Sequence, residues 1–151
     1  MNMKIVSTFR DLDVYRLARE ANREIFAVTK TFPREERYAA IDQIRHCSCA
    51  TKALIAEAWG RRRYKSVFTN KLDEAPGEAN EVLSWLDDAV DCEYIAVELH
   101  EKMIKDWDSI TAKISRMIDR ASDFCRYDSD MDYRSVTQET PVDLEFPPAE
   151  D

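Results

Sequence analysis

Apolar residues recur at alternating intervals of three and four along most of the chain, and this spacing limits the fold more than any other feature. Four such runs occur, within residues 11–32, 33–60, 68–89 and 93–124. Residues three or four positions apart lie on the same face of an α-helix, so each run predicts a helix with one apolar stripe. The stripes comprise Val14, Ala18, Ala21, Ile25, Val28, Phe32; Ile41, Ile44, Ser48, Thr51, Ile55, Ala58; Phe68, Leu72, Ala75, Ala79, Val82, Leu86, Ala89; and Ala96, Met103, Trp107, Ile110, Ile114, Met117, Ala121, Phe124.

Four apolar stripes separated by short connections predict an all-α fold, an antiparallel up-down-up-down four-helix bundle. The composition agrees, because the 151 residues include only two glycines, Gly60 and Gly77, and 44% are hydrophobic. Such a chain can bury a substantial core, and it lacks the turn residues that β structure requires.

Prolines and glycine indicate where the helices begin and end. Pro33 follows the first stripe, where it suits the first turn of a second helix, and Gly60 is a plausible end for that helix. Pro76 falls inside the third run and removes the hydrogen bond to the carbonyl of Leu72, which costs about 3 kcal/mol in a regular helix. The stripe resumes in phase after Pro76, so we expect a kink rather than a break.

The charge of the chain is unevenly distributed. The net charge is −8, and residues 127–151 hold eight acidic side chains against Arg134 alone, a balance of −7 that leaves −1 for the other 126 residues. This segment also contains three prolines and no helical periodicity. We therefore divide the chain into a bundle, residues 1–126, and an acidic, proline-containing tail, residues 127–151, that is expected to be irregular.

The location of the protein follows from its amino terminus and its cysteines. Charged residues interrupt the first twenty positions, so neither a signal peptide nor a membrane span is expected, and we place the protein in the cytoplasm. The four cysteines have no framework spacing and are expected to be free thiols in a reducing compartment.

Metal and enzyme signatures are weak. His46, Cys47 and Cys49 are ligand types for zinc, but the two cysteines are about 200° apart around a helix, so one ion cannot reach both. The chain has no phosphate loop, nucleophile elbow or Glu-x-x-His pair. We expect no metal, no cofactor and no catalytic activity.

A run of cations beside an aromatic residue is the most suggestive local feature. Guanidinium groups next to an aromatic ring can bind phosphates and stack on unpaired bases. If the helix continued in phase through Gly60, Arg45 and Lys52 would lie on the same helical face as Arg63. The candidate binding residues are Arg45, Lys52, Arg61, Arg62, Arg63, Tyr64 and Lys65. The alternative reading, that these cations only stabilise a helix carboxyl end and pair with acidic residues, carries equal weight.

Five large aromatic residues are more than one small core needs. Most aromatic residues at helical spacing belong to the core, but some of these five are expected to cover a subunit interface, where Trp and Tyr are enriched. They are Tyr38, Trp59, Trp85, Tyr94 and Trp107.

The four segments together resemble a known family. The runs FRDLDVYRLA, FPREERYAAIDQIR, IAEAWGRRRYKSVFTNKLDEA and GEANEVLSWLDDAVDCEYI are similar, in this order over about residues 9–120, to the 23S ribosomal RNA intervening-sequence proteins. The resemblance implies a four-helix bundle that assembles into a homopentameric ring and has no enzymatic activity. A related protein, the accessory variability determinant of diversity-generating retroelements, binds a reverse transcriptase and RNA. The resemblance implies a binding role only at positions that match the family's motifs. These are Gly60, Arg61 and Arg62 in its Gly-Arg-Arg segment and Arg45 in the preceding Asp-Gln-Ile-Arg segment.

These observations predict a non-catalytic oligomeric scaffold or adaptor that binds RNA or an RNA-handling protein through its basic surface. The alternative is a purely protein-binding module whose acidic tail covers the basic residues or competes for them. A third hypothesis is a small-molecule or metal site within the bundle.

Overall fold

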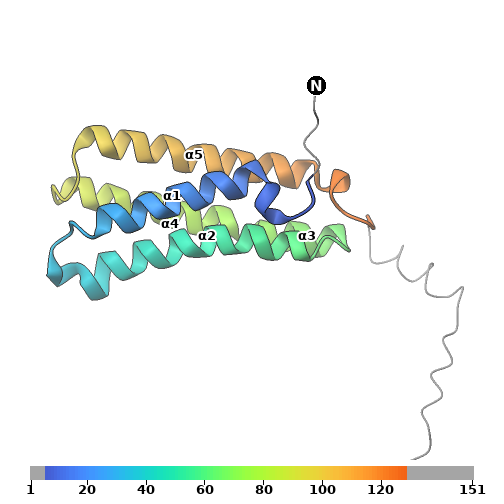
Figure 1. Cartoon of the computed structure of the whole chain (residues 1–151), viewed down its shortest axis with the longest axis horizontal. Helices are drawn as coiled ribbons and strands as arrows, with labels where there is room; N and C mark the ends of the chain where they lie inside the picture. The colour runs from blue at the N-terminus through green and yellow to red at the C-terminus, as the bar shows by residue number, and fades with distance from the viewer. Residues whose placement is uncertain (1–5, 129–151) are drawn as a thin grey trace, which may run out of the picture.

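The computed structural model describes residues 6–128, and within them the chain forms a four-armed helical bundle (Figure 1). The helices are α1 Asp13–Thr29, α2 Asp42–Gly60, α3 Lys65–Leu72, α4 Ala75–Asp91 and α5 Val97–Asp119. Helices α3 and α4 follow one another along the third arm. Helices α1 and α4 each pack against both α2 and α5, so neighbours in sequence are neighbours in space. The predicted all-α, up-down-up-down bundle is confirmed.

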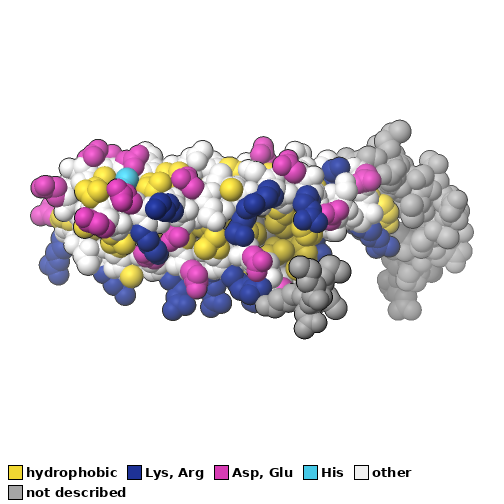
Figure 2. Space-filling view, turned by 90° about the horizontal axis from the view of Figure 1, so that it is seen from above, with side chains coloured by type: hydrophobic (Ala, Val, Ile, Leu, Met, Phe, Trp, Pro, Cys, Tyr) yellow, Lys and Arg dark blue, Asp and Glu magenta, His cyan; other side chains and the backbone are white. Residues whose placement is uncertain are grey.

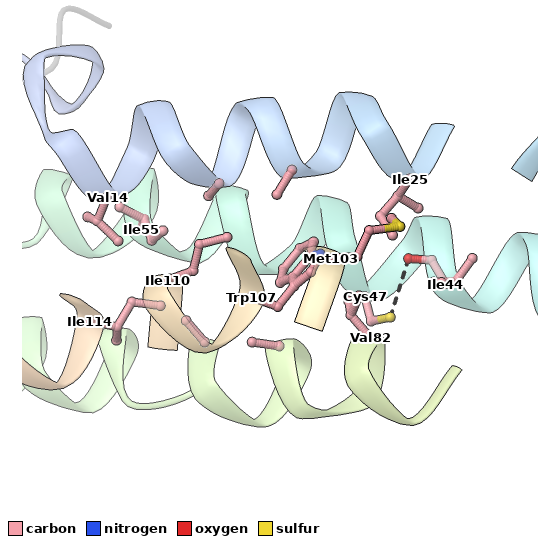
Figure 3. Packing of buried hydrophobic residues seen from close by; sticks show 14 of the residues in the cluster. Val14, Ile25, Ile44, Cys47, Ile55, Val82, Met103, Trp107, Ile110 and Ile114 are labelled. Atoms are coloured by element: carbon pink, nitrogen blue, oxygen red, sulfur yellow. Dashed lines mark hydrogen bonds between the residues drawn. The ribbon is translucent and has the colours of Figure 1, made fainter. Parts of the chain in front are cut away.

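Most of the core consists of the four predicted apolar stripes, and buried Leu12, Cys47, Trp59 and Ile95 complete it. Figure 3 shows Trp107 of α5 at the centre, with Cys47 of α2 and Val82 of α4 around it. Every stripe residue is buried except Val28 and Phe124, which are half-buried, and Ala96, which is exposed in the turn before α5. The stripes thus account for most of the interior of the bundle.

Polar groups in the middle of the α2 stripe are buried together with their hydrogen-bond partners. The Ser48 hydroxyl donates to Oδ1 of Asn22 on α1 at 2.6 Å, and the Thr51 hydroxyl donates to the carbonyl of Cys47 at 2.9 Å. A buried polar group costs little when it is paired, so these residues occupy core positions between α1 and α2.

The third arm is interrupted rather than merely kinked. Helix α3 ends at Leu72 and α4 begins at Ala75, while Asp73 and Glu74 between them keep right-handed helical dihedral angles. Pro76 therefore lies in the first turn of α4, where its missing N–H costs no intrahelical hydrogen bond. The stripe stays in phase across the interruption, as predicted.

The connections between α1 and α2 and between α4 and α5 are longer than the sequence pattern indicates. The second helix was expected from residue 33, but residues Arg34–Glu36 form a 3₁₀ turn and Arg37–Ile41 a π-helical turn before α2. Ala39 there has non-helical dihedral angles of −122° and −105°. Likewise the fourth helix, expected from residue 93, begins at Val97, because Glu93 turns the chain with a positive φ of 59°.

Two further predictions concern the cysteines and the tail. All four cysteines are free thiols, and burial, reinforced by Glu81, raises the pKa of Cys47 to about 12. Tyr127 and Asp128, the first residues of the predicted tail, contact the bundle; residues 129–151 lie outside the described part. No helix within residues 6–128 is long and apolar enough to span a bilayer.

Candidate functional site at the basic end of the bundle

The seven candidate residues do not lie together, and Arg45, Lys52 and Arg63 do not share one helical face. Helix α2 ends at Gly60, and Arg61 leaves the helical conformation with φ −105° and ψ 20°, so the helical phase does not continue into Arg61–Lys65. Arg45 lies far along α2 from this segment, and Lys52 is half-buried midway. The structure therefore separates Arg45 and Lys52 from the other five.

Arg45 is a structural link between α1 and α2. Its Nε donates to the Thr29 hydroxyl at 2.8 Å, and its guanidinium lies 4.7 Å from the centre of the Phe26 ring. These contacts engage the Nε–H and one flat face of the guanidinium group. Arg45 is thus a less suitable phosphate ligand than its sequence position indicated.

The segment that contains the other five residues pairs with the end of the described chain. Arg126 and Tyr127 donate their N–H groups to the carbonyls of Arg62 and Arg63, each at 3.0 Å, and Lys65 N–H donates back to the Tyr127 carbonyl at 2.9 Å. This pairing is a short parallel bridge between Tyr64 and Tyr127. Two segments more than sixty residues apart in sequence thereby lie side by side.

The bridge stacks two tyrosine rings. The ring centres of Tyr64 and Tyr127 are 5.9 Å apart with 29° between their planes. Arg63 lies 5.7 Å from the Tyr64 ring centre and Arg126 lies 5.3 Å from that of Tyr127. We call these four residues the Arg–Tyr platform. The two rings stack on each other and a guanidinium lies over each, so the platform brings together the aromatic and cationic groups that stack on bases and neutralise phosphates.

A hollow of about 510 Å³ lies beside the platform. Its lining includes Arg62, Arg63 and Arg126, with Asp123 as the acidic member. A groove of about 290 Å³ nearby is lined in part by Lys113, Arg116 and Arg120 of the α5 end. Figure 2 shows Lys and Arg side chains near this end around exposed hydrophobic surface. We call the platform, the hollow and the groove the basic end.

Not every cation of the basic end is available to a ligand. The Nε of Arg62 donates to the Trp59 carbonyl at 2.7 Å, and its guanidinium lies 3.6 Å from the Trp59 ring centre. Burial lowers the pKa of Arg62. Arg61 pairs with Glu57 at 3.2 Å, and Lys65 Nζ donates to Ser122 at 2.8 Å. Arg63 and Arg126 are exposed, so a partner can reach both side chains, and each also lies over a tyrosine ring.

Aromatic packing supports the platform from below. The Phe124 ring lies 5.9 Å from Trp59 of α2 and 6.3 Å from buried Phe68 of α3, measured between ring centres. These contacts fix the chain after α5 against α2 and α3. The platform consequently rests on the hydrophobic core.

Sequence reasoning missed two members of the site. Arg126 and Tyr127 were assigned to the edge of the bundle and to the tail, because no helical periodicity covers them. One signal was available: the dipeptide Arg-Tyr at 126–127 repeats the dipeptide at 63–64. A third copy, Arg37–Tyr38, occurs in the π-helical turn at the other end, with Arg37 5.4 Å from the ring centre.

His46, Cys47 and Cys49, the ligand types for which a shared metal ion was not expected, lie apart in the structure. Cys47 faces the core, where its Sγ donates to the Ile44 carbonyl at 3.4 Å, whereas Cys49 donates to Asn22 and His46 is exposed. Among residues 6–128, no group of three or more His, Cys, Asp or Glu side chains could hold a metal ion.

Comparison with known proteins identifies the family. Residues 10–116 match the model of the 23S rRNA-intervening sequence proteins. The chain belongs to this family. A crystal structure of a Bacteroides thetaiotaomicron protein of unknown function, from the S23 ribosomal protein family, is similar to it with 28% identity and a TM-score of 0.64. That similarity covers 70% of this chain and 95% of the other. No curated protein matches the chain.

The match divides the Arg–Tyr platform. Arg63 and Tyr64 lie within the residues matched by the family model, whereas Arg126 and Tyr127 lie beyond residue 116. The basic turn after α2 thus belongs to the part shared with the 23S rRNA-intervening sequence proteins, and its aromatic partner comes from the segment that follows.

Proposed function

We propose that this protein is a non-catalytic oligomeric scaffold or adaptor that binds single-stranded RNA through its basic end. The observation that supports this most is the Arg–Tyr platform, in which two stacked rings each have an arginine beside them. Unpaired bases stack on such rings with a free energy of about 1–3 kcal/mol per base. The name of the family, which refers to an intervening sequence of 23S rRNA, points to the same class of partner.

The charge of the chain sets the expected strength of binding. With a net charge of −8, the protein as a whole repels RNA, so attraction must come from the local cations of the basic end. Contacts to two or three phosphates would give a salt dependence with a slope of about −1.5 to −2. We therefore expect weak binding by one chain.

Oligomerisation would convert weak sites into a useful affinity, since several copies can engage one RNA strand at once. Two exposed apolar side chains at the other end are suitable contacts between copies: Tyr38, 81% exposed, and Val97, 57% exposed. The proposed assembly is the homopentamer. Sedimentation equilibrium would measure its mass, and a mass of one 17.6 kDa chain at micromolar concentration would contradict the oligomeric part of the proposal.

Filter binding tests the RNA part. A labelled single-stranded oligonucleotide is titrated with the protein at about 50 and 200 mM salt. The variant Arg63→Ala/Arg126→Ala is expected to bind at least tenfold more weakly. Lys105→Ala, which removes an exposed cation from α5, is the control and should bind like the wild type. No binding at low salt, or equal binding by both variants, would contradict the proposal.

The alternative function is a protein-binding module in which the acidic tail covers the basic end. It is favoured by the position of Asp128, whose carboxylate accepts a hydrogen bond from Ser122 at 3.1 Å, next to Lys65. The tail therefore starts at the basic end. A chain that stops at Asp128 keeps the platform and loses seven acidic residues. If the tail covers the basic end, the truncated chain should bind a polyanion more tightly than the full chain. If the tail is independent, truncation removes only long-range charge repulsion, and at high salt, which screens that repulsion, the two chains should bind equally.

A further inference from the structure

A second cavity, of about 200 Å³, lies at the end of the bundle opposite the basic end. It is formed by the turn between α1 and α2, the last turns of α4 and the turn before α5. Three aromatic rings and three carboxylates line it, and its lining includes no Lys or Arg. These six residues are Phe32, Trp85, Tyr94, Glu36, Asp88 and Asp91. We call this the acidic cavity.

The walls of the acidic cavity are held in place by specific contacts. The rings of Phe32 and Tyr94 meet at 47° with centres 5.3 Å apart, which forms a corner. The Tyr94 hydroxyl donates to Glu36 Oε1 at 2.8 Å, and the Ala40 N–H donates to Glu36 Oε2 at 3.4 Å. Tyr94 N–H donates to the Ala89 carbonyl at 2.8 Å. The corner is therefore preformed, with its residues drawn from both turns.

The chemistry of the lining indicates a cation. The face of an aromatic ring is electrically negative and attracts a cation within about 6 Å of its centre, and nearby carboxylates add to this attraction. Figure 2 shows acidic side chains gathered where α4 turns into α5. An apolar ligand would gain nothing from the three carboxylates, and an anion would be repelled by them.

An inorganic cation fits poorly. A divalent ion requires several oxygen ligands that converge at about 2–2.5 Å. No group of three or more acidic, His or Cys side chains within residues 6–128 has that arrangement. Aromatic walls instead suit the methyl or methylene groups of an organic ammonium ion, which spread their positive charge over an apolar surface.

We propose that the acidic cavity binds the ammonium group of a small alkylated amine, with its alkyl groups against Trp85 and Tyr94 and its charge balanced by Glu36, Asp88 and Asp91. Phe32 forms the floor. The cavity is large enough for a head group of this size and too small for a nucleotide. The site is independent of the proposed RNA function, since none of the residues of the basic end takes part in it.

Isothermal titration of the full chain with choline tests the proposal. The uncharged 3,3-dimethylbutan-1-ol, which has the same shape, is titrated in parallel. We expect saturable choline binding in the millimolar range and at least tenfold weaker binding of the alcohol, since cation–π and carboxylate attraction both require the charge. No saturable heat with choline, or equal binding of the alcohol, would overturn the proposal.

Two variants locate the site. Asp88→Asn removes one charge from an exposed position and should weaken choline binding about fivefold, and Trp85→Leu should weaken it further. Asp119→Asn, which removes an exposed carboxylate at the other end of α5, is the matched control and should bind choline like the wild type. Circular dichroism checks the fold of each variant. Unchanged binding by Asp88→Asn and Trp85→Leu would overturn the assignment.

A short peptide that contains trimethyllysine distinguishes the source of the amine. Tighter binding of the peptide than of choline would assign the ammonium group to a protein side chain. Weaker binding of the peptide would assign it to a free small molecule. Both ligands are expected to bind in the same cavity, so Trp85→Leu should weaken the binding of the peptide as well as that of choline.

Discussion

The two ends of the bundle both have aromatic walls but carry opposite charges around them. At the basic end, the rings of Tyr64 and Tyr127 stack with an arginine beside each. In the acidic cavity, the rings of Phe32 and Tyr94 meet at an angle beside Glu36. The charges around the rings, rather than the rings themselves, decide whether an end suits an anionic or a cationic partner. Both proposed sites draw on segments that connect or follow the helices, joined in the acidic cavity by Trp85 and Asp88 of α4.

The basic end, unlike the acidic cavity, is supported by packing of Phe124 on the core residue Phe68. The largest predicted effect on stability tests this support. Phe68 is fully buried and supports Phe124, which carries the platform. Phe68→Ala should lower the free energy of unfolding by about 3–5 kcal/mol, because it leaves a cavity under the basic end. Urea denaturation measures the loss. A loss below about 1 kcal/mol would show that the platform does not depend on the core.

A smaller effect is expected for ring stacking at the basic end. Tyr127→Leu keeps an apolar side chain but removes the ring, so binding of single-stranded RNA should weaken by about 1–2 kcal/mol. Binding of duplex RNA, whose bases are already stacked, should change much less. Fluorescence anisotropy with both RNAs measures the ratio. An equal loss for the two would mean that Tyr127 contributes to structure rather than to base stacking.

The Tyr94–Glu36 hydrogen bond in the wall of the acidic cavity should make the free energy of unfolding depend on pH in the alkaline range. The hydrogen bond that Tyr94 donates to Glu36 raises the pKa of Tyr94 from 10.0 to about 12. The folded state therefore holds this proton more tightly than the unfolded state, and the stabilisation is complete below pH 10 and lost as the pH rises toward 12. Tyr94→Phe should remove this part of the alkaline loss of stability.

Urea midpoints at pH 9, 10 and 11 measure the effect for wild type and variant. The difference between them should shrink as the pH rises. Tyr38→Phe, which removes a hydroxyl from a ring that is 81% exposed, is the matched control, and its difference from wild type should stay constant. A constant difference for Tyr94→Phe as well would contradict the Tyr94–Glu36 hydrogen bond.

The smallest effect concerns thiol reactivity. Cys92 is exposed and lines the acidic cavity, whereas Cys47 is buried with its pKa raised to about 12. Alkylation with iodoacetamide, followed by mass spectrometry, should modify Cys92 first and Cys47 last, because only the accessible thiolate reacts. Choline at saturating concentration should slow the modification of Cys92 alone. Rapid modification of Cys47 would show that the core opens readily.

The fold could be predicted from the sequence because its determinants are local and periodic. Each stripe, such as Val82, Leu86 and Ala89 on α4, repeats at helical spacing, and one face of each helix must be buried. The turns could not be predicted in the same way. Glu93 ends α4 with a φ of 59°, a conformation for which glycine is the usual signal, and Glu36 before the π-helical turn accepts a hydrogen bond from distant Tyr94. Propensity carries no information about such contacts.

The candidate site was predicted in part for the same reason. Arg63 and Tyr64 were identified as a cationic and aromatic pair from their adjacency alone. Tyr127 was missed because its role arises from main-chain hydrogen bonds to a segment far away in sequence. Arg45 was included because spacing along a helix does not show whether Thr29 and Phe26 already occupy a guanidinium group.

The short bridge between residues 62–65 and 126–127 has a consequence for design. Its hydrogen bonds join main-chain groups, and the side chains at positions 63, 64, 126 and 127 add ring and cation contacts to this pairing. Main-chain pairing thus brings these four positions together from segments far apart in sequence. If the basic end binds RNA as proposed, substitutions at these positions would be the most direct way to redesign what it recognises.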